Sequence, residues 1–83
     1  MEKREMEIAI EMIVDDVNWY SLNAERAKKR NLPMIEQDYF SRILGIGIAI
    51  SYFGYTLEED ERRVDCGAGI EPMEYMHYKA IKR

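Results

Sequence analysis

The stretch from Ile43 to Leu57 carries no charged side chain, although 34% of the 83 residues in the chain are charged. Burial of apolar side chains is the dominant favourable contribution to folding, so this run is expected at the centre of the fold. It is shorter than the roughly 20 apolar residues that a membrane-spanning helix requires. We therefore predict a core element around which a small domain packs, with no membrane partner.

Size and cysteine content limit how such a domain can be stabilised. The chain is expected to form one domain, residues 1–83, and Cys66 is its only cysteine, which excludes an intramolecular disulfide and a cysteine-based zinc cluster. Stability must then come from well-packed helices or from association with another chain. The N-terminus has no secretory or transit signature, so we expect a cytoplasmic protein.

Two long helices are predicted. In residues 2–29 the apolar positions recur at spacings of three and four, which is the period of an amphipathic helix. Asn31 can adopt the left-handed conformation that ends a helix, and Pro33 is acceptable in the first turn of the next one. Residues 33–53 continue with a second helical stripe, formed by Ile35, Tyr39, Ile43, Ile46, Ile50 and Phe53.

The central run also fits a strand. From Leu44 to Tyr52 large apolar residues alternate with Gly, Ala and Ser, which is the period of a β-strand, and isoleucine favours strands. Such a strand needs partners, for which residues 62–66 and 75–81 are candidates. An α+β fold with a strand at 44–52 is therefore the alternative to the second long helix.

The C-terminal third carries signals for two short helices. Thr56, followed three residues later by Glu59, matches a capping box and predicts a helix over residues 57–65. Pro72 favours the start of a last helix over residues 72–81. The predicted fold is all-α, a small helical bundle of two long and two short helices.

The length of the first helix bears on assembly. About 28 helical residues extend about 42 Å at 1.5 Å per residue, whereas a compact domain of this size is about 30 Å across. A straight first helix therefore extends beyond its own domain with its apolar stripe uncovered. We expect a homo-oligomer, most simply a two-fold helical dimer.

Basic residues gather at the end of the first helix and at the C-terminus. Cations at a helix C-terminus complement the helix dipole, which is sufficient to explain the first group. The alternative is an anion site between two chains, in which arginine grips a phosphate in bidentate fashion and an aromatic ring stacks on a base. The candidate residues for a nucleotide or another small anion are Arg26, Lys29, Arg30, Lys79, Arg83, Tyr20 and Trp19.

The acidic run Glu58, Glu59, Asp60 and Glu61 has two interpretations. It fits the solvated first turn of the predicted helix over residues 57–65. It also fits a partner-binding patch that mimics nucleic-acid phosphates or enters a basic groove on another protein. The net charge of −4 disfavours binding to duplex DNA, which usually requires a basic face.

No residue pattern indicates catalysis or a cofactor. Glu7, Glu11 and Asp15 recur every four residues, but a magnesium site of this kind needs a second carboxylate pair on a facing helix, and a solvated face is the favoured interpretation. Glu74 and His77 have the Glu-x-x-His spacing of di-iron bundles, which use two such pairs, whereas this chain has one histidine. We expect no metal, no cofactor and no enzymatic activity.

Together these features predict a non-enzymatic, acidic binding protein that inhibits or regulates a macromolecular partner. A single small domain with mixed charge clusters and no catalytic signature resembles the accessory proteins of phages and mobile elements, such as anti-defence proteins. The alternative is an oligomeric protein that sequesters a nucleotide or another anion between its chains.

Overall fold

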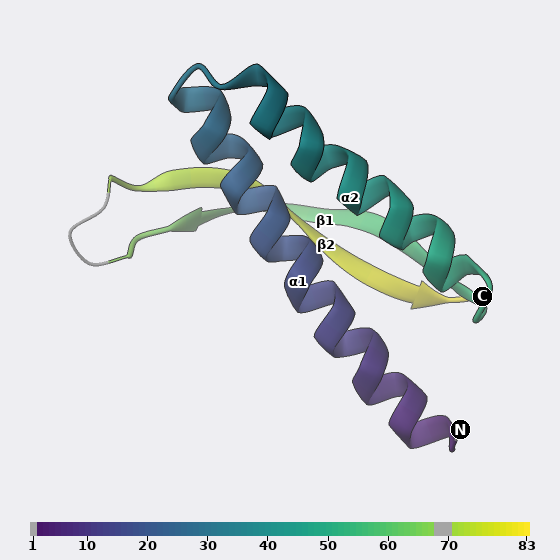
Figure 1. The fold of residues 1–83 in the computed structure, drawn as a ribbon. Coiled ribbons are helices and arrows are strands. Elements are labelled where there is room, and N and C mark those ends of the chain that lie inside the picture. The colour runs from purple at the N-terminus through teal and green to yellow at the C-terminus, as the bar shows by residue number, and fades with distance from the viewer. Residues whose placement is uncertain (1, 68–70) are drawn as a thin grey trace.

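The computed structural model describes residues 2–67 and 71–83. The strands form a two-stranded antiparallel sheet, and α1 lies across it with α2 alongside α1 (Figure 1). The fold is therefore α+β, and the predicted all-α bundle of four helices is wrong. The elements in chain order are α1 (Lys3–Lys29), α2 (Pro33–Ser51), β1 (Tyr55–Asp65) and β2 (Met73–Lys82).

The two predicted long helices are present. Asn31 ends α1 in the left-handed conformation, with φ of 58°, and the Leu32 N–H donates to the Ala27 carbonyl at 2.9 Å, as in a Schellman motif. A proline occupies the first turn of α2, as predicted. The second helix ends at Ser51, two residues before the predicted boundary, and Gly54 with φ of 85° leads the chain into β1.

The alternative strand at residues 44–52 is wrong, because α2 continues through this segment. Ile43 and Ile50 are both buried, and their separation of seven residues is close to two helical turns. In a strand an odd separation would place them on opposite faces. Burial of this helical face outweighs the helix cost of Gly45 and Gly47, which is about 1 kcal/mol each.

The two predicted short helices are also wrong, because residues 57–65 and 72–81 pair with each other as strands. The antiparallel register runs from Tyr55 opposite Lys82 to Asp65 opposite Met73. The glutamates and arginines of β1 are good helix formers, but intrinsic propensity is a weak preference that tertiary pairing overrides.

A β-bulge explains why the sequence of β1 lacks the alternating pattern of a strand. The register places Leu57 opposite Ala80 and Val64 opposite Glu74, and Asp60 is the extra residue between the two halves of the strand. Because of this insertion, Leu57 and Val64 lie on the same face of the sheet although they are seven residues apart. The alternation of two that normally indicates a strand is therefore lost in the sequence.

The core lies where α1, α2 and β1 meet. Ile10, Ile50 and Tyr55 form its buried centre, and partly buried side chains from all four elements pack against it. The protein measures 41 × 26 × 18 Å, and the 27 residues of α1, at about 1.5 Å per residue, account for the longest dimension. In the described part of the chain, no helix is long and apolar enough to cross a membrane.

Candidate functional site

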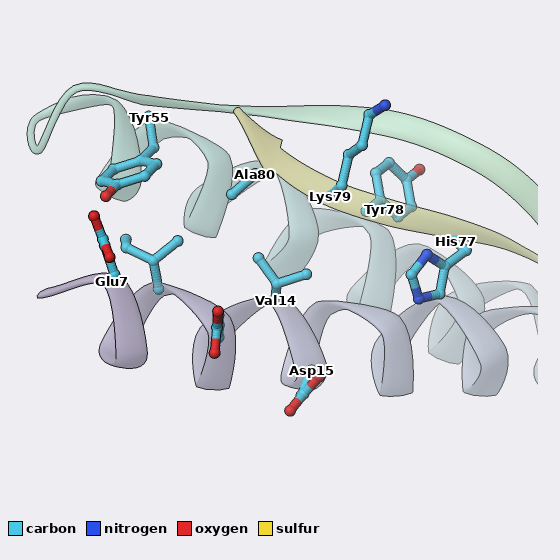
Figure 2. Close-up of a pocket in the computed structure, with 10 residues that line it drawn as sticks. Glu7, Val14, Asp15, Tyr55, His77, Tyr78, Lys79 and Ala80 are labelled. Atoms are coloured by element: carbon cyan, nitrogen blue, oxygen red, sulfur yellow. The ribbon is translucent and has the colours of Figure 1, made fainter. Parts of the chain in front are cut away.

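A groove runs between the N-terminal half of α1 and the C-terminal half of β2. Its volume is about 490 Å³. Figure 2 shows Val14 pointing from α1 toward β2, with Ala80 on the strand above it. Ile10 and Tyr55, which are buried in the core, complete the apolar part of the lining.

The groove begins where α1 stops bonding the outer edge of β2. The Asn18 amide donates to the Tyr78 carbonyl at 3.1 Å and accepts from the Tyr78 N–H at 2.7 Å. Two residues earlier on β2, the Met76 carbonyl accepts a hydrogen bond from the Ser21 hydroxyl. These bonds cover the strand edge at Tyr78 and Met76 in the way that a third strand would.

Beyond Tyr78 the edge of β2 is open. In an antiparallel ladder every second residue turns both backbone groups away from the partner strand. Since Asn18 bonds both groups of Tyr78 from outside, Ala80 also directs its N–H and C=O away from β1. Among residues 2–67 and 71–83, no side chain or loop backbone bonds these two groups. The groove therefore contains a free donor and a free acceptor at a strand edge.

Carboxylates line the α1 side of the groove. Glu7, Glu11 and Asp15 lie one helical turn apart, and none of them forms an ion pair with another described residue. Figure 2 shows Glu7 pointing toward Tyr55, whereas Asp15 at the rim points away from β2. The Lys79 side chain points away from α1 in the same view. The α1 wall is therefore negative, and its three carboxylates form no ion pair among the described residues.

Asp60, the extra residue of the bulge, lies among three basic side chains. Its carboxylate is 3.5 Å from Arg63 Nη2, 3.4 Å from His77 Nδ1 and 3.7 Å from Lys79 Nζ. The other imidazole nitrogen, His77 Nε2, lies 3.0 Å from Arg63 Nη1. A guanidinium group can only donate, so Nε2 accepts this bond. These contacts join Asp60, Arg63 and His77 into one cluster at the bulge.

Tyr78 contributes a neutral polar group to the lining. Burial raises the pKa of its phenol, and the nearby negative charge of Glu59 raises this pKa further. Both effects disfavour the phenolate, so the phenol remains protonated at physiological pH.

The predicted anion-binding residues are distributed over three places. The first is the end of α1, where Arg26 Nη2 lies 2.8 Å from Asp65 Oδ2 and Lys29 pairs with Glu71. Arg30 is exposed at the same helix end. An anion that bound here would compete with two carboxylates for the first two cations.

The second place is the opposite end of the sheet. Arg83 donates to the Thr56 hydroxyl there, and Lys79 is engaged with Asp60. The sheet is about 30 Å long at 3.3 Å per residue, so Arg83 cannot reach the Arg26 end within one chain. A combined site would require the two ends to come from different chains.

The third place is the contact between α1 and α2. The rings of Trp19 and Tyr20 lie 5.8 Å apart, and the Tyr39 ring of α2 lies 5.9 Å from that of Tyr20. The Arg42 guanidinium lies 5.7 Å from the centre of the Tyr20 ring. The two aromatic candidates therefore lie beside the contact between the helices, where Trp19 remains 55% exposed.

The predicted acidic patch is divided by the strand. Asp60 and Glu61 are paired with Arg63, the latter at 2.9 Å. Glu58 and Glu59 are exposed, and as neighbours in a strand they point to opposite faces of the sheet. The four acids therefore do not form one continuous surface.

The pairs considered for metal binding do not converge. In the described residues, no group of three or more His, Cys, Asp or Glu side chains is arranged to hold a metal ion. Glu74 and His77 are three residues apart on a strand, so they point to opposite faces. Cys66 is an exposed free thiol after the end of β1.

In the sequence the three groove carboxylates are recognisable only as a solvated helix face. Ala80 and Tyr55 carry no sequence signal for the groove, because their place in it depends on β2 lying beside α1. The free N–H and C=O of Ala80 can be recognised only once the two C-terminal segments are known to pair as strands. Comparison with protein-family models, curated proteins and solved structures found no match, so the groove is interpreted from its own geometry.

Proposed function

We propose that the protein is a non-enzymatic binding protein that inhibits or regulates a macromolecular partner by holding a basic, extended segment of it in the α1–β2 groove. The observation that carries the proposal is the open backbone edge at Ala80 beside the unpaired carboxylates of Glu7 and Glu11. An extended segment can bond such an edge as an added strand. Its lysine or arginine side chains then meet the carboxylates of α1.

The charge of the groove selects the class of ligand. The carboxylates of Glu7 and Glu11 on one wall and a net charge of −4 attract a cationic segment and repel a nucleotide or another anion. The apolar floor, which includes Ile10 and Val14, favours apolar side chains between the basic ones. Because successive side chains of a strand alternate, a segment that alternates basic and apolar residues fits both surfaces.

The experiment uses a fluorescently labelled peptide in which lysine and valine alternate. Its binding is measured by fluorescence anisotropy, and an otherwise identical peptide of glutamate and valine is the ligand control. The double variant Glu7→Gln, Glu11→Gln is expected to weaken binding of the lysine peptide by about tenfold, which corresponds to about 1.4 kcal/mol. The matched control variant is Glu58→Gln, Glu59→Gln, which removes the same charge from β1 and is expected to leave binding unchanged.

Hydrogen exchange tests the strand addition directly. Saturating peptide is expected to slow exchange of the Ala80 amide, because a free edge donor becomes bonded. Unchanged exchange at Ala80, equal binding of the acidic peptide, or a larger loss in the β1 control than in the groove variant would each contradict the proposal.

A further inference from the structure

The second helix is apolar on two opposite sides. Ile43 and Ile50 are buried inside the chain, whereas Leu44 is 68% exposed and Ile48 is 54% exposed. A helix that is apolar all round is normally covered all round. Leu44 and Ile48 border a shallow pocket with Leu57 of β1, but more than half of each side chain stays exposed, so the chain itself covers this side only at its edge.

The outer side has the shape of a ridge beside a furrow. Phe40, Leu44, Ile48 and Tyr52 are four residues apart and exposed, which makes one continuous row of large side chains. The adjacent row at the same spacing consists of Ser41, Gly45 and Ala49. A Cβ atom on Gly45 would meet no heavy atom within 4 Å, so the furrow is open at its centre.

This surface also lacks charge. No charged residue occurs between Ile43 and the end of α2, and the nearest charge, Arg42, pairs with Asp38 at 3.2 Å. A partner must therefore offer an uncharged surface with large side chains that enter a narrow furrow. The same ridge on another copy of the chain meets both requirements, since rows at a spacing of four interlock when two helices cross at about −50°.

We propose that α2 packs against α2 of a second copy of this chain, with the ridge of each copy in the furrow of the other. The contact is two-fold symmetric, because each copy presents the same ridge and the same furrow. It uses α2 alone, so the α1–β2 groove of each copy remains open. The dimer is thus independent of the proposed peptide binding, and each can fail without the other.

The test is the mass of the full-length chain in solution by sedimentation velocity, from about 1 µM to about 100 µM. We expect a species of twice the 9.9 kDa chain mass to increase with concentration. Leu44→Glu is expected to weaken the dimer at least tenfold, because it places a charge in the apolar contact. The matched control is Met12→Glu, an equally exposed apolar residue of α1, at 65%, which is expected to leave the dimer intact.

A second variant keeps the test decisive if Leu44→Glu does not fold. Gly45→Leu fills the furrow without a clash inside the chain and replaces glycine by a better helix former. It is expected to retain the far-ultraviolet circular dichroism of the wild type and to sediment as a monomer. A wild-type monomer at the highest concentration, a Gly45→Leu dimer, or loss of the dimer in Met12→Glu would each overturn the proposal.

Peptide binding separates the two proposals. The monomeric variants are expected to bind the lysine peptide as the wild type does, and the Glu7→Gln, Glu11→Gln variant is expected to sediment as a dimer. If the dimer variants also lost peptide binding, the groove and the dimer contact would be coupled, and the independence stated above would be wrong.

Discussion

The two helices of this protein differ in a way that their compositions do not suggest. α1 is rich in charge, yet it buries Ile10, Val17, Ser21, Ala24 and Ala27 along its length. α2 is the more apolar helix, yet it buries only Ile43 and Ile50. The difference lies in side-chain size and in polar bonding.

Small residues and two polar groups place α1 against its neighbours. Ser21, Ala24 and Ala27 have short side chains, so α2 and β2 can approach the α1 backbone closely. Asn18 and Ser21 bond the edge of β2 from the same helix. By contrast, α2 passes β1 at Gly47, where an added Cβ atom would lie 3.8 Å from the Leu57 side chain. The apolar character of a segment thus does not decide whether its own chain buries it.

The largest loss of stability is expected from a substitution on the buried, inner side of α2. Ile50 is 2% exposed at the centre of the core, so Ile50→Ala removes buried methyl groups and leaves a cavity. We expect a loss of about 2–5 kcal/mol in the free energy of unfolding, measured by urea denaturation. The control is Met34→Ala on the same helix, at a residue that is 85% exposed, and its effect should stay within about 0.5 kcal/mol. Equal losses would show that the two sides of α2 are equally buried.

The next largest loss of stability is expected from removing the hydrogen bonds between α1 and the edge of β2. Asn18→Ala leaves the backbone N–H and C=O of Tyr78 without partners, which is expected to cost about 1–3 kcal/mol. The matched control is Asn23→Ala, because the Asn23 amide bonds only the Trp19 carbonyl within its own helix and is exposed. A control variant as unstable as Asn18→Ala would contradict the edge-covering role of Asn18.

A third prediction compares Gly45 inside α2 with Gly54 in the turn before β1. Gly54 has φ of 85°, so Gly54→Ala forces a side chain into a left-handed backbone and is expected to cost about 1–2 kcal/mol. Gly45 is helical and its Cβ position is open, so Gly45→Ala is expected to raise the stability of the monomer by up to about 1 kcal/mol. Thermal unfolding at a low protein concentration measures both, and effects of the same sign would contradict the comparison.

The smallest effect concerns alkaline pH. Since burial raises the pKa of Tyr78 above its ordinary value of 10.0, the native state favours the neutral phenol. Its contribution to stability is complete below the unfolded pKa and is lost as the pH rises through the higher folded pKa. Tyr78→Phe should therefore lose less stability than the wild type between about pH 9 and about pH 11. The control is Tyr52→Phe, at an exposed ring, and a loss as small as that of Tyr78→Phe would argue against burial as the cause.

The helical half of the fold follows from local chemistry. Asn31 and Pro33 mark the connection between the helices, and Gly54 marks the turn that follows the second one. Each acts through its own backbone preference, so the sequence indicates its effect without knowledge of the rest of the chain. The spacing of Ile43 and Ile50 likewise identified the inner face of α2.

The candidate site was only half predictable. Glu7, Glu11 and Asp15 are recognisable in the sequence as one helix face, but a helix face becomes one wall of a groove only when another element lies opposite. That element is β2, and its open edge at Ala80 depends on how far Asn18 and Ser21 of α1 cover the strand. The sequence likewise did not indicate that Arg26 pairs with Asp65 and Arg63 with Asp60, because the partners come together only in the folded chain.

The sequence by itself determined the first helix, the turn that follows it and the uncharged character of α2, because helix periodicity and end residues act over a few neighbouring positions. For residues 44–52 it left helix and strand open, and the burial of Ile43 and Ile50 on one helical face decided for the helix. Only the tertiary structure decided that the C-terminal third forms a hairpin. The helix-forming residues of β1 and the bulge at Asp60 conceal its strand pattern, and the pairing energy that overrides them comes from β2 residues eight to 27 positions away, from the Asp65–Met73 pair to the Tyr55–Lys82 pair. Which charges pair and which remain free then followed from that hairpin.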